Sequence, residues 1–466
     1  MKVTRSDIRL KANPRRVIPM YFQLGNVDRV KRVVNRIMTL SDIDIVEQLE
    51  SVFEKFEHRH KNFSRVLIDN FYRTEKLINI DISCSDDKKL LIGSYFTNEY
   101  SIQSAALFNP SIVSHFDQSD SNDIELKFIL SLRATGERHI SSIEFREGKV
   151  SSEGEVHLAK ESDIAVTASK YERKEYTLNF LKTCLTDASI AELDLVNKLP
   201  EKFNIIELNK YKVDGQEYNN IDELIDSNYE CLFHEDLDLS ERVLFPLSNS
   251  ESMGMEDARF VRFTDDNGEL TYYATYTAFN DRKIQTKLIT TKDFLKFKIS
   301  TPCGSAVQNK GFAIFPRKIE GKYCITSRLD SENMFIMFSD DMHVWDNSQI
   351  LQIPEEPWEF IQLGNCGSPL ETKEGWLLLT HAVGPMRRYV ISAMLLDLKD
   401  PSKVIKKMKE PLLEPNEDER EGYVPNVVYS CGSIIHKKNL IIPYAMSDTT
   451  CGFAKVTLDE LLNNMN

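Results

Sequence analysis

Two adjacent acidic residues and an arginine open a predicted β-strand in the segment GMEDARF, residues 254–260. Strands usually alternate polar and apolar residues, so Glu256, Asp257 and Arg259 make an unusual strand start. A carboxyl group beside a cation can serve acid–base catalysis, in which one group transfers a proton and another orients it or holds the substrate. A solvated turn is the alternative for the same residues, and the surrounding pattern has to decide between the two.

Short strands recur around this segment at a nearly constant period. Arg259, Phe315, Pro369 and Val427 occupy equivalent positions, separated by 56, 54 and 58 residues. Each copy has a strand, a turn and a more hydrophobic strand that ends in polar residues, and a fifth copy lies upstream at residues 106–136. Because units of four short strands at this period are typical of propeller blades, we predict a mainly β fold, a five-bladed β-propeller. A β-sandwich is the alternative, but sandwiches do not repeat so regularly.

Two stretches outside the repeat have helical patterns. Apolar residues recur at three- and four-residue spacing between residues 28 and 75, and again between residues 165 and 230. We therefore predict an N-terminal helical or α+β extension (1–95), a first blade (96–165), a helical insertion (166–248) and four further blades (249–466). Neither helical stretch has a chemical motif, so we expect each to pack against the propeller, shape its pocket or form a contact in a homo-oligomer.

Composition and charge exclude several classes of protein. A net charge of -14 argues against a general nucleic-acid binder, which needs a basic surface to neutralise phosphates. No apolar run approaches the length of a membrane span, and the N-terminal segment lacks the apolar core of a secretory signal, so we expect a cytoplasmic protein with no membrane partner. The eight cysteines are widely spread without a CxxC pair, which favours free buried thiols and no zinc site.

The repeat places polar residues from all five blades at one rim. In an antiparallel hairpin, the start of the first strand and the end of the second strand lie at the same edge. The residues expected to meet at a central pocket are Asn109, Arg133, Glu256, Asp257, Arg259, Lys310, Arg328, Asn365, His381, Glu419, Glu421 and Asp448. Carboxylates, amides and guanidinium groups around one pocket suit a sugar, whose hydroxyls need both donors and acceptors.

These groups permit acid-assisted cleavage of a glycosidic bond with inversion, which needs a proton donor on one side and a nucleophile on the other. Asp257 or Glu256 is the candidate acid. The nucleophile is either water activated by Glu419 or Glu421, or inorganic phosphate held by Lys310, Arg328 or the pair Arg387 and Arg388, which needs no protein base. Neither route requires a metal or a cofactor, although phosphate would be a co-substrate.

Several motifs in the same order resemble those of glycoside hydrolase family 130, the five-bladed propeller enzymes of β-mannoside phosphorolysis and hydrolysis. The motifs are GMEDARF with YYATYTAF, FPRKIEGKY, GNCGSPLETKEGWLLLTHAV, LLDLKDPSKVI, EREGYVPNVVYSCG and YAMSD. The resemblance covers roughly residues 103–165 and 250–460. It implies that Asp257 is the general acid, acting through a sugar hydroxyl. It also implies that Asn109, Arg133, Arg259 and Asp448 hold the mannose that is cleaved.

The sequence departs from the phosphorylase pattern of this family at three places, one of which is Arg317 in place of the glutamate of the FPE motif. Ser327-Arg328-Leu329 replaces a His-Arg-Pro triplet, and Gln362 stands where a lysine is common. Both losses weaken a phosphate site, so we expect a β-1,2-mannosidase-type hydrolase that releases mannose from a mannose-containing oligosaccharide. A β-mannoside phosphorylase releasing mannose 1-phosphate is the alternative, favoured by the remaining cations and the expected cytoplasmic location. A non-catalytic carbohydrate-binding propeller is a remote third reading, because the acid motif is intact.

Overall fold

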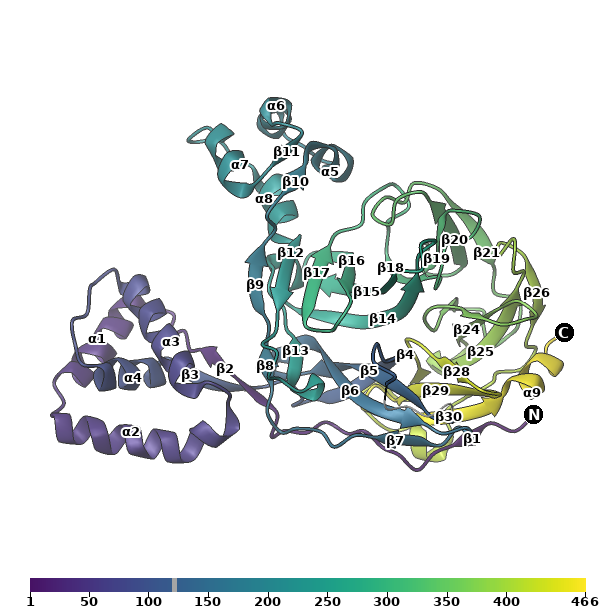
Figure 1. Ribbon diagram of the computed structural model, residues 1–466, viewed down its shortest axis with the longest axis horizontal. Helices are drawn as coiled ribbons and strands as arrows, with labels where there is room; N and C mark the ends of the chain where they lie inside the picture. Colours follow the sequence, from purple (N-terminus) through teal and green to yellow (C-terminus); the bar gives the residue numbers. More distant parts are fainter. Residues whose placement is uncertain (120–123) are drawn as a thin grey trace.

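A computed structural model describes residues 1–119 and 124–466 of the chain, and β-strands dominate its centre. Figure 1 shows short sheets grouped around a common middle, with two sets of helices projecting away from them. The mainly β fold expected from the repeat is therefore present. Both chain ends lie on the same side of the molecule, beside the last sheet.

The strands form five antiparallel units in chain order. The first unit contains β4 (Ala106–Ser114), β5 (Leu126–Thr135), β6 (Ser141–Val150) and β7 (Val156–Leu158), and the second contains β14 (Gly254–Thr264), β15 (Leu270–Phe279), β16 (Ile284–Thr291) and β17 (Lys296–Ser300). The third contains β18 (Lys310–Ile314), β19 (Tyr323–Arg328), β20 (Met334–Ser339) and β21 (Ser348–Gln352). The fourth contains β22 (Gln362–Asn365), β23 (Leu370–Glu371), β24 (Trp376–Val383), β25 (Tyr389–Leu396) and β26 (Val404–Lys407). The fifth contains β27 (Val428–Tyr429), β28 (Ile434–His436), β29 (Asn439–Met446), β30 (Thr450–Thr457) and, from the N-terminus, β1 (Thr4–Arg5).

Apolar side chains bind each unit to its neighbours. One buried cluster joins the first and second units, and further clusters join the second to the third, the third to the fourth and the fourth to the fifth. Another cluster joins the fifth unit back to the first, with Leu107 and Phe128 packed against Ile441 and Phe453. Removing these faces from water is the main stabilising contribution between the units. The strands alternate so that their apolar residues face neighbouring sheets, which is what the hydrophobic second strands of the repeat predict.

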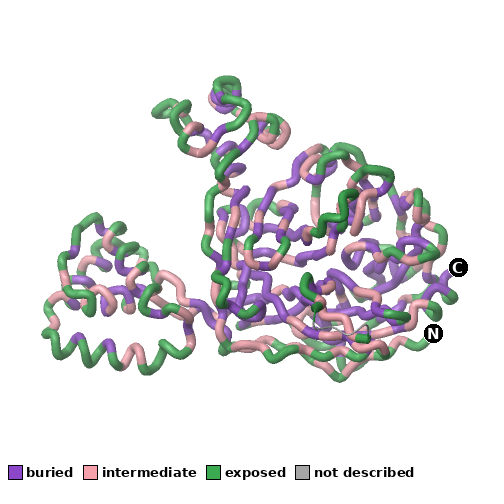
Figure 2. The backbone as a smooth tube through the Cα atoms, viewed as in Figure 1, coloured by how far each residue is buried: buried purple, intermediate pink, exposed green. Residues whose placement is uncertain are grey.

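Four helices form a separate N-terminal group, as the pattern at residues 28–75 predicted. They are α1 (Val27–Met38), α2 (Asp42–Phe56), α3 (Phe63–Ile78) and α4 (Asp86–Tyr95), and a hairpin of β2 (Val17–Tyr21) and β3 (Thr97–Ser101) connects them to the sheets. Side chains of Asn26, Ser41 and Ser85 accept hydrogen bonds from the first turns of α1, α2 and α4, which explains where these helices begin. Figure 2 shows that only the inner faces of this group are buried.

The region expected to be a helical insertion contains both helices and strands. The helices are α5 (Leu178–Cys184), α6 (Ile190–Lys198), α7 (Ile205–Tyr211) and α8 (Asn219–Asp226), and a last helix, α9 (Leu458–Asn463), ends the chain. The strands are β8 (Val166–Thr167), β9 (Ser169–Glu172), β10 (Tyr176–Thr177), β11 (Lys202–Phe203), β12 (Tyr229–Leu232) and β13 (Arg242–Leu244). Strands β12 and β9 continue the sheet of the second unit beyond β17, so the insertion grows out of that sheet. The division of the chain into four domains stays a prediction.

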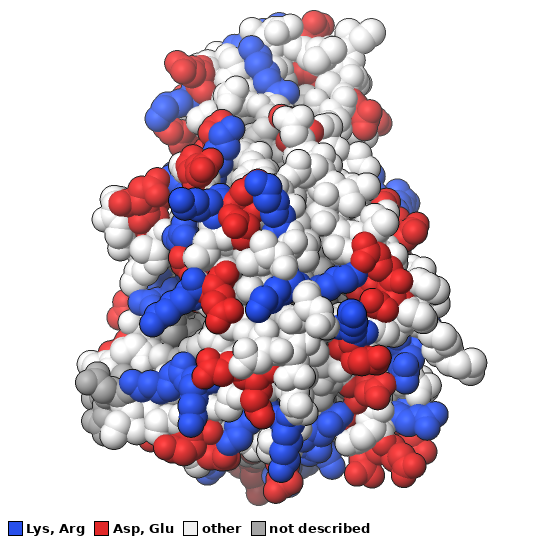
Figure 3. Space-filling model, turned by 90° about the vertical axis from the view of Figure 1, so that its right-hand side faces the viewer, with Lys and Arg blue, Asp and Glu red and all other residues white. Residues whose placement is uncertain are grey.

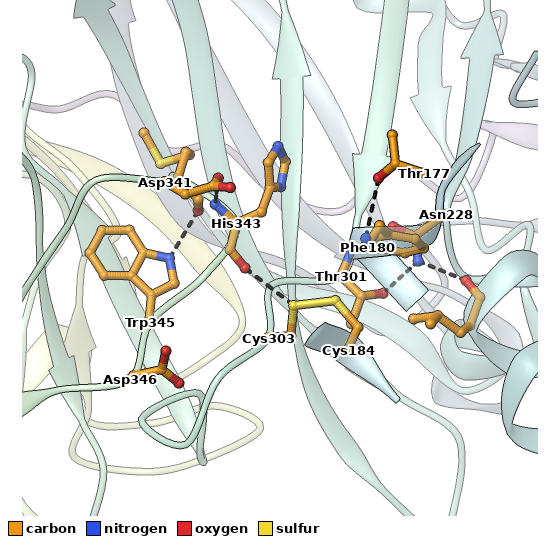
Figure 4. Close-up of a disulfide and its surroundings, with 12 residues drawn as sticks. Thr177, Phe180, Cys184, Asn228, Thr301, Cys303, Asp341, His343, Trp345 and Asp346 are labelled. Carbon is orange, nitrogen blue, oxygen red and sulfur yellow. Dashed lines mark hydrogen bonds between the residues drawn. A yellow bond between two sulfur atoms is a disulfide. The ribbon is translucent and has the colours of Figure 1, made fainter. Parts of the chain in front are cut away.

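The expectation of free cysteines is wrong for two of the eight. Cys184 and Cys303 form a disulfide with their Cα atoms 5.1 Å apart, although 119 residues separate them in the chain. Figure 4 shows this bond between the end of α5 and the loop after β17, where Cys303 exchanges backbone hydrogen bonds with His343 and Trp345. Sequence spacing could not reveal the pair, because only the packing of the insertion against the second unit brings these positions together. The other six cysteines are free.

The length of the helices and the charge on one face of the molecule can be described directly. None of the helices within residues 1–119 and 124–466 is long and apolar enough to cross a membrane. On the face drawn in Figure 3, lysine and arginine side chains are interspersed with aspartate and glutamate, so no large basic surface forms there.

The disulfide predicts the number of reactive thiols. We expect a thiol-specific reagent to titrate six thiols per denatured chain without reductant, because Cys184 and Cys303 are then blocked, and eight after reduction. A double variant with Ser at both positions should give six in both conditions. Eight thiols in the unreduced wild-type chain would contradict the disulfide.

Candidate active site

The first strands of the first three units contain a β-bulge at the same position. In β4 the irregularity lies between Phe108 and Ser111, in β14 between Glu256 and Arg259, and in β18 between Lys310 and Ala313. The first extra residue of each bulge has a positive φ, in the order Asn109 (49°), Asp257 (56°) and Gly311 (84°). A bulge turns its extra residue out of the ladder, and positive φ at a non-glycine residue is uncommon outside special sites. The unusual start of GMEDARF is therefore a bulge that redirects Asp257.

The bulges surround a cavity of about 160 Å³. All five units contribute to its lining: Asn109, Arg133, Asp257, Arg259, Lys310, Gly311, Arg328, Gly364, Asn365, His381, Arg387, Tyr389, Val427, Tyr429 and Asp448. Nine of the twelve residues that the repeat predicted for a central pocket are among them. The cavity is thus assembled from strand starts and strand ends that are far apart in sequence.

Asp257 is a buried carboxylate held by an amide and a cation. Asn109 Nδ2 donates to its Oδ1 at 2.5 Å, and Arg133 Nη1 lies 3.1 Å from the same oxygen. Burial favours the neutral carboxyl, but the charges of Arg133, Lys310 and Arg259 and the hydrogen bond from Asn109 outweigh it. They hold the pKa of Asp257 below its ordinary value, so this carboxyl is ionised at neutral pH.

Arg259 connects three of the units through one guanidinium group, and Asn365 extends the network to a fourth. It donates to the Asp257 backbone oxygen at 2.9 Å, to Asn365 Oδ1 at 3.2 Å and to the Tyr429 hydroxyl at 2.6 Å. Asn365 in turn donates from Nδ2 to the Gly311 backbone oxygen at 2.6 Å. These contacts use three of the five guanidinium donors and, with Asn365, join the second, third, fourth and fifth units around the cavity.

His381 is a neutral imidazole in the cavity wall. Its Nδ1 lies 2.9 Å from the Asn365 carbonyl oxygen, so Nδ1 carries the proton and donates it there. Nε2 then accepts, with Gln362 Nε2 at 3.2 Å and Arg328 Nη1 at 3.5 Å. Burial, Arg328 and Arg259 lower the pKa of His381 well below its ordinary value. His381 therefore presents an acceptor to Arg328, not a second positive charge.

The cavity is strongly positive although the chain as a whole is acidic. Five of its lining residues are cations (Arg133, Arg259, Lys310, Arg328 and Arg387), whereas only Asp257 and Asp448 are acids. Burial and the charge of Asp257 raise the pKa of Asp448 to about 6, even though nearby cations oppose the shift. The two acids are therefore different, because the pKa of one is lowered and that of the other is raised.

Three predicted site residues lie outside the cavity lining. Glu256 pairs with Arg133 at 2.6 Å and supports that arginine from the side. The Glu419 carboxylate accepts from Arg5 Nε at 3.0 Å and from the Tyr444 hydroxyl at 2.6 Å, and caps a one-turn 3-10 segment at residues 417–419. Glu421 is exposed. Neither Glu419 nor Glu421 is among the residues that line the cavity, so their interpretation as catalytic base gains no support from the cavity lining and stays a prediction.

Some lining residues were not among the predicted site residues. Tyr429 and Tyr389 lie near His381, and their rings pack against its imidazole at centroid distances of 4.7 and 6.2 Å. The motif NVVYSCG contains Tyr429, but nothing in it distinguishes a lining tyrosine from a core tyrosine. Arg387 was considered only as a phosphate ligand. It reaches the cavity because it and Met386 both have positive φ, which their sequence does not predict.

The described residues contain no cluster of three or more His, Cys, Asp or Glu side chains that could hold a metal ion.

The raised pKa of Asp448 predicts a pH-dependent gain in stability for Asp448→Asn. Wild-type folding favours protonated Asp448, and this contribution is lost as pH rises from about 4 through 6. The variant cannot ionise, so we expect it to be more stable than wild type at pH 7.5, by up to about 3 kcal/mol, and equal to it near pH 4. Denaturant unfolding at both pH values measures the difference. Asp214→Asn, at an exposed position, is the control; a pH-independent difference for Asp448→Asn would contradict the assignment.

The contacts of Glu419 predict a structural effect. Glu419→Gln weakens the bonds to Arg5 and Tyr444, so we expect it to cost about 1–3 kcal/mol of unfolding free energy. The turnover number measured below the unfolding temperature should stay within about two-fold of wild type, since the cavity is unchanged. Glu421→Gln is the exposed control for both measurements. A hundred-fold loss of turnover at unchanged stability would identify Glu419 as a catalytic base.

Comparison with known proteins shows the family to which the chain is similar. The family model for glycoside hydrolase family 130, described as beta-1,4-mannooligosaccharide phosphorylase, matches residues 204–466. A 1,2-beta-oligomannan phosphorylase of Thermoanaerobacter sp. (strain X514) is 36% identical over 233 residues, which are 48% of this chain and 75% of that relative. A beta-1,2-mannobiose phosphorylase of Listeria innocua is 33% identical over 229 residues, which are 48% of this chain and 63% of that relative.

Among solved structures, the complex of the Listeria innocua beta-1,2-mannobiose phosphorylase with beta-1,2-mannobiose aligns with a TM-score of 0.49 and 25% identity, covering 78% of this chain and 92% of the other. The family model covers more than half of the chain and includes GMEDARF. The resemblance inferred from the motifs is therefore confirmed, and the chain belongs to glycoside hydrolase family 130 as an enzyme of that family.

Proposed function

We propose that this enzyme is a β-mannoside phosphorylase, which transfers a β-linked mannosyl residue from an oligosaccharide to inorganic phosphate and releases α-mannose 1-phosphate. One observation carries the proposal. Of the five cations in the cavity, only Arg133 has a carboxylate partner within the described part of the chain. The other four leave an excess of positive charge in a partly enclosed space, which favours an anionic co-substrate over water.

The internal repeat supplies a comparison between two of these arginines. Arg133 pairs with Phe108 in the first unit, and Arg328 occupies the same position opposite Lys310 in the third. Arg133 forms ion pairs with Glu256 and Asp257, whereas the Nε atom of the buried Arg328 has no hydrogen-bond partner within residues 1–119 and 124–466.

A buried charge without a counter-charge is costly, and two like charges facing each other across a hairpin are destabilising. We therefore assign the phosphate to the space between Lys310 and Arg328. A phosphate dianion there accepts from both side chains and neutralises their repulsion.

This proposal replaces the expectation of hydrolysis. That expectation depended on the missing histidine at Ser327 and the missing lysine at Gln362. In the structure Lys310, Arg328 and Arg387 line the cavity, so the positive charge is supplied by other residues. The named relatives are phosphorylases, and the first two act on β-1,2-linked mannosides by name. We therefore propose a β-1,2-linked mannooligosaccharide as the substrate.

We propose Asp257 as the general acid. Its pKa is held low in part by Lys310, so a phosphate dianion that binds Lys310 also raises the pKa of Asp257 towards protonation. The proton passes to the glycosidic oxygen, directly or through a sugar hydroxyl, as the bond to the anomeric carbon breaks. A phosphate oxygen forms the new bond from the opposite face, which inverts the configuration. Asn109, Arg133, Arg259 and Asp448 surround Asp257 and are proposed to hold the mannosyl hydroxyls.

We also propose that the five units close into a five-bladed propeller with the cavity at its mouth. Two features support closure, namely the apolar cluster shared by the fifth and first units and a backbone hydrogen bond from Cys431 to Pro110 at 2.9 Å. The two helical segments are proposed as additions at 1–95 and 166–248. A cytoplasmic location, where phosphate is plentiful, suits a phosphorylase and remains part of the proposal.

The central test is incubation with β-1,2-mannobiose with and without inorganic phosphate. We expect mannose 1-phosphate and mannose with phosphate, and little cleavage without it. Free mannose released equally in both conditions would show hydrolysis instead. No cleavage of any β-mannoside would refute the proposed substrate class.

Variants separate the proposed roles. Asp257→Asn should lower the turnover number by roughly 10²–10⁴-fold while sugar binding persists, because the general acid is lost. Arg328→Met should raise the KM for phosphate with a smaller effect on mannoside binding. Arg317→Met is the control, since Arg317 pairs with Glu371 outside the cavity. An unchanged phosphate KM for Arg328→Met would contradict the assigned phosphate position.

A further inference from the structure

Gly311 is the repeat counterpart of two polar residues of the active site. In β4, β14 and β18 the bulge residue that follows Phe108, Glu256 and Lys310 has positive φ. The first two units place an asparagine and an aspartate at this position, Asn109 and Asp257, and these two side chains meet in the cavity. The third unit places a glycine there, so one of three equivalent positions presents no side chain.

The space beside Gly311 is open. A Cβ atom built on this residue meets only one heavy atom within 4 Å, the Arg328 Cβ at 3.9 Å, and Gly311 itself lines the cavity. Several other glycines would bring a Cβ within 3 Å of their neighbours; at Gly254, for example, it would lie 2.6 Å from the Ser141 backbone nitrogen. Close packing therefore does not explain the glycine at 311.

Backbone conformation does not by itself demand glycine either. Its φ of 84° is unfavourable for most side chains, but Asn and Asp tolerate the left-handed region, and Asn109 and Asp257 adopt it at 49° and 56°. The Gly311 peptide is also held in place, because its carbonyl accepts from Asn365 Nδ2 at 2.6 Å. An Asn or Asp at 311 would carry the strain of a positive φ, as Asn109 and Asp257 do, but would meet no close neighbour beside the cavity.

We infer that Gly311 is a specificity-determining position, which keeps open the space where an anion meets Lys310 and Arg328. A side chain here would occupy the space next to Arg328, whose Nε has no hydrogen-bond partner among the described residues, and an acidic one would supply a counter-charge that none of those residues provides there. The inference rests on the proposed function, because it names the residue that leaves the phosphate position free. The bulges in β14 and β4 contribute Asp257, the proposed acid, and its amide partner Asn109. The inference gives the third bulge, in β18, a role in selecting the co-substrate.

Two variants of nearly equal size separate the effect of added charge at position 311 from the effect of added volume. Gly311→Asp places a carboxylate beside Lys310 and Arg328, so we expect the KM for phosphate to rise at least ten-fold. Gly311→Asn adds a similar volume without charge, and the phosphate KM should rise by no more than about three-fold. The two variants share the same backbone strain, so the difference between them reports charge at this position.

Gly321 is a matched control in the same hairpin. It has a φ of 80°, no heavy atom within 4 Å of a built Cβ, and an exposed position outside the cavity lining. Gly321→Asp should reproduce any loss of stability caused by an acidic side chain at positive φ while leaving the phosphate KM at the wild-type value. Thermal unfolding of all three variants shows whether they are folded under the assay conditions.

Direct binding makes the inference independent of turnover. Calorimetric titration of wild type and variants with inorganic phosphate should show at least ten-fold weaker binding to Gly311→Asp than to Gly311→Asn. Equal phosphate affinity and equal KM for these two variants would overturn the inference. If wild type binds phosphate but shows no phosphate-dependent cleavage, the proposed function is wrong. The inference about Gly311 is then tested by the phosphate affinities of the two variants alone.

Discussion

The arrangement of the cavity depends on the hydrogen bonds that the guanidinium group of Arg259 donates. This group donates in three directions, to the strand that contains Asp257, to Asn365 and to Tyr429, which belong to three different units. Asn365 extends the network to the backbone of Gly311. No unit by itself holds a complete set of active-site groups. Hydrogen bonds to a buried, permanently charged group are among the stronger ones, and their geometry fixes the positions of the units they join.

Local irregularity of the backbone produces the site, and regular packing elsewhere supports it. The bulges in β4, β14 and β18 interrupt the ladder and turn one residue each towards the middle. Positive φ at Asn109 and Asp257 is less favourable than an ordinary strand conformation. Buried apolar clusters between all neighbouring units supply the stabilisation that permits it. The strands are therefore regular where they pack against one another and irregular where they face the cavity.

Electrostatic asymmetry around the cavity divides it into two parts. On one side Arg133, Asn109 and Asp257 form a paired set in which the carboxylate is stabilised. On the other side Lys310 and Arg328 face each other without a carboxylate among the described residues. Neutral His381 adds no charge to that side, because its Nδ1 proton is engaged by a backbone carbonyl. A site of this kind is suited to a neutral sugar on the paired side and an anion on the unpaired side.

The repeat and the motifs of the amino-acid sequence are sufficient to predict the mainly β fold, the family and most of the cavity lining. The repeat period identifies equivalent strand starts and strand ends, and nine of the twelve residues chosen there line one cavity. Periodicity is sufficient because residues at equivalent positions of a repeated hairpin lie at the same edge. The sequence does not predict three features of the structure, namely the contacts of Glu419 with Arg5 and Tyr444, the bond between Cys184 and Cys303, and the place of Gly311 beside an arginine whose Nε has no partner among the described residues. Each of these depends on distances between segments far apart in the chain, and packing between units sets those distances while local sequence does not.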